Sequence, residues 1–234
     1  MRGTTGDVAA ICGLIDTEVQ KAYNSSVRSR ECGILMAFRA AGRKPPTIVN
    51  SSVARTREYL TGAEIETLMA AARKSSRYGH RDATMILIAY RHGLRASEIC
   101  DLQWHQVELT AGRLHVRRTK RGTPSVHPMR GDEMRALRRL QREQDPAGPH
   151  VFASERGGPM TAKSFHTLIS RLGERARMPF RIHPHMLRHA CGYALANAGH
   201  DTRALQAWFG HRNIQHTVRY TELSPARFRD FWKD

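Results

Sequence analysis

The ten residues His183-Pro-His-Met-Leu-Arg-His-Ala-Cys-Gly192 are the most informative stretch of this chain. A proline is well tolerated in the first turn of a helix, so Pro184 predicts that a helix begins here. Small and aliphatic side chains recur at helical spacing and predict a buried stripe of Leu187, Ala190, Cys191, Ala194, Leu195 and Ala198. His185, Arg188 and His189 fall on another face, near the positive end of the helix, where an anion is favoured.

Two histidines four residues apart, His185 and His189, also allow a zinc-site interpretation. In the H-E-x-x-H pattern of metalloproteases a glutamate follows the first histidine, but Met186 stands there in this chain. No nearby carboxylate offers a third ligand, so no metal is expected. Two roles stay open for His189: packing against a neighbouring segment, or a place in a phosphate site.

The residues that follow predict a shorter helix from Asp201 to Phe209, ended by Gly210 in the left-handed conformation. Its expected buried face consists of Leu205, Trp208 and Phe209. His211 comes directly after this rigid element and can point into a site. Tyr220 lies nine residues further on, which draws attention to both residues.

A tyrosine is a poor nucleophile when neutral, because its ordinary pKa is about 10. A catalytic tyrosine must therefore lie against cations and a proton acceptor. We interpret Tyr59, Tyr90 and Tyr193 as packing residues, whereas Tyr220 follows Arg219 in a polar stretch. From the residues alone, Tyr220 is one candidate among six tyrosines.

The charge of the chain indicates a polyanionic partner, because 38 Lys and Arg against 21 Asp and Glu leave a formal charge of +17. Nucleic acid is the first candidate. An anionic membrane is the competitor, but no run approaches the roughly 20 apolar residues of a membrane span. We therefore expect a soluble protein. The four cysteines lack metal-ligand spacing and are expected to be reduced, as in a cytoplasmic protein: Cys12, Cys32, Cys100 and Cys191.

Upstream, residues 1–57 are predicted to be an irregular N-terminal extension, and residues 58–234 a single domain. Thr61 and Glu64 have the spacing of a capping box that opens a helix. Its expected buried stripe is Ile65, Leu68, Met69 and Ala72. Further helices are predicted at 82–92, ended by Gly93, and at 96–102.

The spacing of apolar residues then changes to the alternation typical of strands. Val107 and Leu109 alternate before a turn at Ala111-Gly112, and after it the alternation continues through Leu114, Val116 and Arg118. A second turn at 119–122 leads to a strand at 125–129. The rest is expected to be helical, with breaks at 145–150, 157–159, 178–179 and 199. The predicted fold class is mainly α with a small three-stranded antiparallel sheet.

Taken together, several separated motifs resemble the tyrosine recombinase (phage integrase) family, and most closely its short fimbrial phase-switch recombinases, which invert DNA segments. They are Gly93-Leu-Arg-Ala-Ser-Glu98, the segment 183–192, Gly210-His-Arg-Asn213 and His216-Thr-Val-Arg-Tyr220. The resemblance extends from about Leu60 to Trp232. It implies the DNA breaking-rejoining catalytic domain, and chemistry that needs neither a metal nor another cofactor.

The resemblance also implies roles for the matching residues. Arg95 and Arg188 would hold the non-bridging oxygens of the scissile phosphate. Tyr220 would attack the phosphorus and form a 3′-phosphotyrosyl bond. Lys120 would protonate the leaving 5′-oxygen, which an ammonium can do and a guanidinium effectively cannot. The alternative for Lys120 is a DNA-backbone contact beside the other basic residues of the hairpin, Arg117, Arg118 and Arg121.

Two further histidines receive roles from the resemblance. His185 would act as general acid or base, and His211 would hydrogen-bond the phosphate in the transition state. Glu98 lies three residues after Arg95, so it would hold that guanidinium or a neighbouring histidine, or form an ordinary surface ion pair. His189 is a supporting residue.

The implied partner is double-stranded DNA at specific recombination sites, bound by a homotetramer on two sites, with possible accessory DNA-bending proteins. An apolar tail after Tyr220 would dock on a neighbouring subunit or on its own domain; it contains Phe228, Phe231 and Trp232. Inversion, integration and excision stay open. Two alternatives remain: a type IB topoisomerase-like enzyme that nicks and reseals one duplex, and a non-catalytic DNA-binding regulator with the same fold.

Overall fold

The computed structural model describes residues 58–75, 77–119, 122–144 and 148–222, all within one compact unit, Thr56–Asp234. The expected N-terminal extension, residues 1–57, lies outside the described residues. So do Lys120, Arg121 and the tail residues Phe228, Phe231 and Trp232. What the sequence predicts for these parts stays a prediction.

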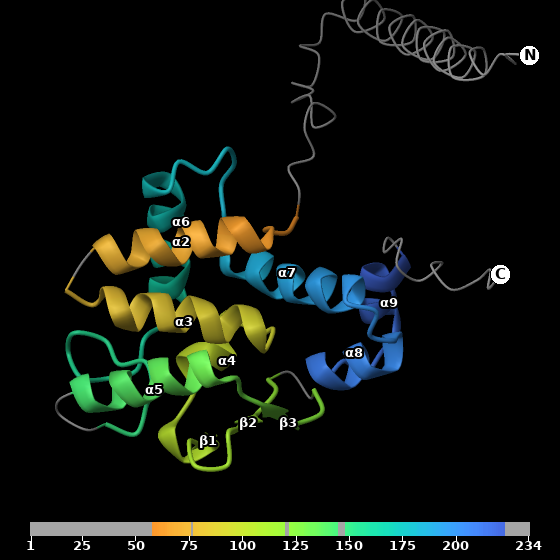
Figure 1. Ribbon diagram of the computed structural model, residues 1–234, viewed down its shortest axis with the longest axis horizontal. Coiled ribbons are helices and arrows are strands. Elements are labelled where there is room, and N and C mark those ends of the chain that lie inside the picture. Colours follow the sequence, from red (N-terminus) through yellow and green to blue (C-terminus); the bar gives the residue numbers. More distant parts are fainter. Residues whose placement is uncertain (1–57, 76, 120–121, 145–147, 223–234) are drawn as a thin grey trace, which may run out of the picture. The chain divides into compact units, whose positions relative to one another are not determined.

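Helices make up most of the described chain (Figure 1). Their bounds are α2 Gly62–Ser75, α3 Gly79–Arg91, α4 Ala96–Cys100, the 3-10 turn η1 Trp104–Gln106, α5 Gly131–Glu143, α6 Ala162–Arg175, α7 Pro184–Asn197, α8 Thr202–Phe209 and α9 Gln215–Glu222. The strands are β1 Val107–Glu108, β2 Arg113–Val116 and β3 Ser125–Pro128. This confirms the predicted fold class, mainly α with a small antiparallel sheet.

Helix α2 begins at the predicted capping box. The backbone N–H of Thr61 donates to Glu64 Oε2 at 2.7 Å, and the Thr61 hydroxyl accepts from the Glu64 backbone N–H at 3.3 Å. These bonds satisfy two backbone groups that the first helical turn leaves without partners. The expected stripe is buried in full: Ile65, Leu68, Met69 and Ala72.

Helix α3 lies at the centre of the packing, between α2 and α5, and also contacts α7 (Figure 1). It begins at Gly79, three residues before the predicted start. A Cβ on Gly79 would lie only 2.8 Å from the carbonyl oxygen of Ala72, so glycine permits a close approach to the end of α2. At the other end Gly93 has φ +56° and lies against the ring of Phe209, which leaves no space for a side chain.

The three strands pair antiparallel in the order β1-β2-β3. Leu114 pairs with Val107 on one side and with His127 on the other. Leu114 and Val116 are buried, as their alternation predicts. The sheet contacts α8 through β3, so the hairpin that connects β2 and β3 is close to the C-terminal helices.

The prediction for helix α7 is partly wrong. Ala194 and Ala198 are exposed, whereas Arg188 is 1% exposed and His189 is 6% exposed. Helix α7 contacts α2, α3, α6, α8 and α9. Because neighbouring helices surround its first half, residues 186–192 are all buried and no open polar face exists there.

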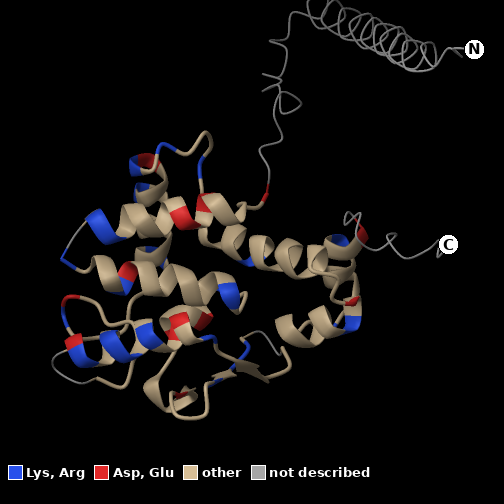
Figure 2. Ribbon diagram, viewed as in Figure 1, with Lys and Arg blue, Asp and Glu red and all other residues tan. Residues whose placement is uncertain are grey.

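Between α5 and α6 the sequence predicted breaks at 145–150 and 157–159 with helical residues between them, and this is wrong for residues 151–156, which form no helix. The described part of this segment forms two isolated antiparallel bridges, Gln103 with His150 and Ala153 with Pro159, and it buries Val151 and Phe152. Basic side chains are distributed over many elements, with several along α5 (Figure 2). No helix among the described residues has the length and apolar character of a bilayer span.

Candidate active site

Arg95 and Glu98 lie at the first turn of α4, with Arg95 as the N-cap residue. The Arg95 backbone N–H donates to Glu98 Oε2 at 3.0 Å, and its guanidinium donates to Oε1 at 2.6 Å. Burial alone raises the pKa of Glu98, but the hydrogen bond from the Arg95 backbone and the charge of Arg118 outweigh it and lower this pKa below its usual value. Glu98 is thus an ionised carboxylate that is only 6% exposed, so an ordinary surface ion pair is ruled out.

Arg188 is buried on α7 and is hydrogen-bonded to the turn before α4 and to the end of α8 with the residues that follow it. Its guanidinium donates to the backbone carbonyl of Gly93, to the carbonyl of Phe209 at 3.2 Å and to His211 Nε2 at 2.8 Å. It also lies over the Phe209 ring, 4.7 Å from the centroid. The turn before α4 and the end of α8 are therefore both hydrogen-bonded to one side chain of α7.

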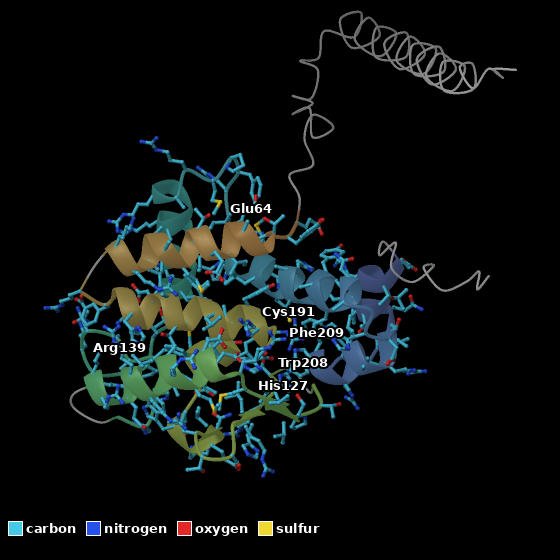
Figure 3. The ribbon with its side chains drawn as sticks, in the orientation of Figure 1. Glu64, His127, Arg139, Cys191, Trp208 and Phe209 are labelled. Atoms are coloured by element: carbon cyan, nitrogen blue, oxygen red, sulfur yellow. The ribbon has the colours of Figure 1, made fainter. Side chains whose placement is uncertain are left out.

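Phe209 and Trp208 lie beside Cys191 where α8 meets α7 (Figure 3).

A third guanidinium, from Arg118, belongs to the same cluster, and this corrects the sequence prediction. Arg118 was expected to contact the DNA backbone, but its side chain is 0% exposed. It donates to Glu98 Oε2 at 3.0 Å, to the carbonyl of His92 at 3.4 Å and to the carbonyl of Trp208. Position 118 continues the inward face of the β2 strand, so its alternation with Leu114 and Val116 was the signal that it is buried. Arg117, on the opposite face, is exposed.

The cluster carries more positive than negative charge. In the part of the chain that the structure describes, Arg95, Arg118 and Arg188 all have their ion pairs with a single carboxylate, that of Glu98. Burial, followed by the charges of Arg95 and Arg118, lowers the pKa of Arg188 to about 9. Three guanidiniums around one carboxylate leave an excess of positive charge, which a bound anion would neutralise.

His211 is held as a neutral imidazole. Its Nε2 accepts from Arg188, so the ring proton lies on Nδ1, which donates to the Thr217 hydroxyl at 2.8 Å. Burial and the Arg188 charge lower the pKa of His211 to about 3, which agrees with this tautomer. In this arrangement His211 orients Arg188. Thr217, from α9, was not recognised in the sequence, because nothing in its spacing distinguishes a hydroxyl that orients an imidazole.

Tyr220 projects from α9, packs against side chains of α7 and α8, and is only 2% exposed. Its hydroxyl lies 3.0 Å from His189 Nδ1. The ring packs 5.4 Å from Phe209 and 5.3 Å from Tyr193. Gly192 provides the space, since a Cβ there would lie 2.7 Å from the Tyr220 ring.

Both partners of this hydrogen bond are neutral. Burial raises the pKa of Tyr220, although Arg188 and Arg219 act in the opposite direction. Burial and His185 lower the pKa of His189 to about 3. Nδ1 of His189 is therefore the acceptor and the phenol is the donor. Of the two roles left open for His189, the structure shows it as the packing partner of Tyr220.

His185 is the exposed member of the histidine pair on α7. Its ring lies 4.4 Å from that of His189, edge to face. Burial, then the charge of Arg188, lowers the pKa of His185. The predicted residues thus form two adjoining groups. Arg95, Glu98, Arg188 and His211 make one, and His185, His189 and Tyr220 make the other.

Comparisons with known proteins identify the family of the chain. The model of the phage integrase family matches residues 58–227. The type 1 fimbriae regulatory protein FimE of Escherichia coli K12 is 43% identical over 182 residues, which are 76% of this chain and 91% of that protein. FimB of the same strain is 40% identical over 188 residues, 78% of this chain and 93% of that protein.

Among solved structures, the Tn1549 transposon integrase in complex with circular intermediate DNA superposes with a TM-score of 0.60 at 25% identity, and the match covers 86% of this chain and 74% of that one. The family match spans the described domain and includes every element of the site. The chain therefore belongs to the phage integrase family, the tyrosine-type site-specific recombinases.

Proposed function

We propose that this recombinase cleaves and rejoins DNA at the cluster of Arg95, Arg188 and Glu98, with Tyr220 as the nucleophile. The observation that carries the proposal is the charge of the cluster, in which three guanidiniums share one buried carboxylate. A phosphodiester is a compact anion, and planar guanidiniums suit its non-bridging oxygens. Arg95 is about a quarter exposed, with 27% of its side-chain area open, so a DNA phosphate can reach it.

The proposed reaction forms one bond and breaks one. The Tyr220 oxygen attacks the phosphorus, and the bond from phosphorus to the 5′-oxygen breaks, which leaves a 3′-phosphotyrosyl bond and a 5′-hydroxyl. The phenolic proton passes to the exposed His185, while Lys120 protonates the leaving 5′-oxygen. Rejoining reverses these steps, because the phosphotyrosyl bond conserves the energy of the phosphodiester.

The resting position of Tyr220 places a condition on this reaction. Its phenol is neutral, buried and bonded to His189, so it cannot attack a phosphate on a DNA surface from there. Binding of DNA must free the phenol and turn it toward the arginines. Arg188 is only 1% exposed, so its guanidinium must also become accessible when DNA binds. When it binds the phosphate, His211 is released from it and can take the tautomer that donates from Nε2.

DNA is the partner. We further propose that four copies act on two specific DNA sites in the bacterial cytoplasm, with the apolar tail exchanged between subunits and accessory DNA-bending proteins as possible helpers. Inversion is the outcome we propose, because the sequence resembles the fimbrial phase-switch recombinases that invert DNA, and the type 1 fimbriae regulatory proteins FimE and FimB match 76–78% of this chain at 40–43% identity.

A supercoiled plasmid with two copies of the recombination site tests the outcome. Inverted copies should yield an inverted segment, and direct copies should yield two circles. Relaxation without exchange of segments would instead support the topoisomerase-like alternative. Binding without any change in the plasmid would support the non-catalytic regulator.

A further inference from the structure

Arg118 is a buried cation for which the proposed reaction has no direct use. Its side chain is fully buried, so it cannot touch DNA in this structure. Its Nε has no hydrogen-bond partner among the described residues. Burying a guanidinium carries a large desolvation penalty, and an aliphatic residue would continue the inward face of Leu114 and Val116 without that cost. Stability alone therefore does not explain an arginine here.

The contacts of Arg118 run parallel to those of Arg188. Both guanidiniums donate to the carbonyl of Gly93. At the end of α8 they take consecutive carbonyls, Trp208 for Arg118 and Phe209 for Arg188. The two side chains thus connect the same two segments, side by side. A displacement of Arg118 would therefore disturb the Gly93 carbonyl, which also accepts from Arg188.

Arg118 also shares a carboxylate, that of Glu98, with Arg95, the second proposed phosphate ligand. Glu98 Oε2 accepts from Arg118 at 3.0 Å and from the Arg95 backbone at 3.0 Å, while Oε1 accepts from the Arg95 guanidinium. One carboxylate is therefore shared between the buried guanidinium and the accessible one. Arg118 fixes the carboxylate, and the carboxylate fixes Arg95.

Glycines allow Arg118 to occupy this place. A Cβ on Gly122 would lie 2.7 Å from Arg118 Cβ, and one on Gly210 would lie 2.8 Å from Arg118 Cγ. The backbone N–H of Thr123 donates to the Gly210 carbonyl at 3.2 Å, which closes the backbone around the side chain. His127 and Trp208 stack 3.7 Å apart at the same junction of β3 and α8 (Figure 3).

We infer that Arg118 is a positioning residue for the cleavage reaction, which sets the orientation of both phosphate-binding arginines, Arg95 through Glu98 and Arg188 through shared backbone acceptors. The inference rests on the proposed function of that pair. It assigns to Arg118 an effect on the rate of cleavage and none on the affinity for DNA.

Arg118→Lys tests the inference, because it keeps the charge and removes the planar fork of donors. The substrate is a nicked duplex with the recombination site, in two forms, one with a normal scissile phosphate and one with a methylphosphonate in its place. The methylphosphonate is neutral, so its cleavage depends much less on oriented cations. Single-turnover formation of the covalent adduct is measured at saturating DNA, together with the Kd.

On the normal phosphate Arg118→Lys should lower the rate by about 10- to 100-fold, since misplacing an electrostatic donor costs somewhat less than removing it. The Kd should stay within about twofold, because the side chain is buried. On the methylphosphonate the variant should react within about threefold of the wild type. Equal loss on both substrates would overturn the inference and indicate a purely structural role.

Gly122→Ala provides a second variant in case Arg118→Lys does not fold. Its Cβ would displace Arg118 without touching a charged group, so it should show the same selective loss on the normal phosphate. The matched control is Arg113→Ala, an exposed arginine at the start of β2, the strand that precedes Arg118, and it should leave both rates unchanged. If the wild type forms no adduct with either substrate, the proposed function fails; if only the selectivity is absent, the positioning role fails alone.

Discussion

At the scale of single residues, the buried histidines of the site determine how the protein responds to acid. His189 and His211 have folded pKa values of about 3, whereas a histidine in an unfolded chain titrates near 6.5. Between these values the unfolded state binds more protons than the folded state. The free energy of unfolding is therefore highest above about pH 6.5, as far as these histidines contribute to it, and falls as the pH drops. The steepest slope is about 1.4 kcal/mol per pH unit for each histidine.

His189→Asn should reduce this slope. Asparagine can still accept the hydrogen bond of Tyr220, but it takes up no proton on unfolding. Urea denaturation of both proteins at intervals from pH 7 to pH 4 measures how the free energy of unfolding depends on pH. This dependence should be weaker in the variant by up to about 1.4 kcal/mol per pH unit, which corresponds to one proton. Identical slopes would mean that His189 titrates normally in the folded protein.

Among the site residues, some were visible in local sequence patterns and others depend on contacts between distant segments. The spacing of His185 and Arg188 placed them at the start of α7, and the family resemblance selected Tyr220. The burial of Arg118 was visible in the alternation with Leu114 and Val116, but its basic character suggested DNA. The bond between Tyr220 and His189 joins two helices, and a contact of that kind depends on packing that no local pattern contains.

At the scale of elements, the packing of α9 against α7 depends on a missing side chain. In the middle of a helix a glycine normally costs up to about 1 kcal/mol relative to alanine. Gly192 is different, because a Cβ there would collide with the Tyr220 ring at 2.7 Å. Gly192→Ala should therefore destabilise the protein, by about 1–3 kcal/mol, as overpacked cores do.

Chemical denaturation measures the effect, and Gly62→Ala in α2 is the matched control. Nothing lies within 4 Å of a Cβ on Gly62, so this substitution should leave the stability unchanged or raise it. If both substitutions behave alike, the contact between Gly192 and Tyr220 does not hold α9 in place.

The sequence identified most elements because their signals are local. The capping box of α2, the strand alternation and the left-handed glycine after α8 all depend on neighbours within a few residues. The stripe on α7 was mispredicted because five helices surround that element, and periodicity distinguishes a buried face only when another face meets water.

At the scale of the whole molecule, the charge of +17 governs the affinity for DNA. Each cation that neutralises a phosphate releases counterions, so binding weakens linearly in a plot of log Kd against log salt. Arg117 is exposed and its neighbour Arg118 is buried, so substitutions of the two can be compared in one experiment. Arg117→Ala should weaken binding to a duplex of arbitrary sequence and reduce the magnitude of the salt slope by about 0.9.

Fluorescence anisotropy at a series of salt concentrations measures this slope. Arg118→Lys serves as the comparison and should retain the wild-type slope, because its side chain meets no phosphate. If the salt slope were reduced in Arg118→Lys and unchanged in Arg117→Ala, then Arg118 and not Arg117 would contact a DNA phosphate, which contradicts the prediction.

The central claim, that Tyr220 attacks a phosphate held by Arg95 and Arg188, is tested most directly by trapping the covalent intermediate. A duplex with the recombination site and a nick beside the scissile phosphate loses its 5′-hydroxyl fragment, so cleavage cannot be reversed. Wild-type protein should accumulate a 3′-linked DNA adduct, and mass spectrometry should place it on the peptide that contains Tyr220. Tyr220→Phe should bind the same duplex and form no adduct, whereas an adduct with Tyr220→Phe, or none with the wild type, would contradict the claim.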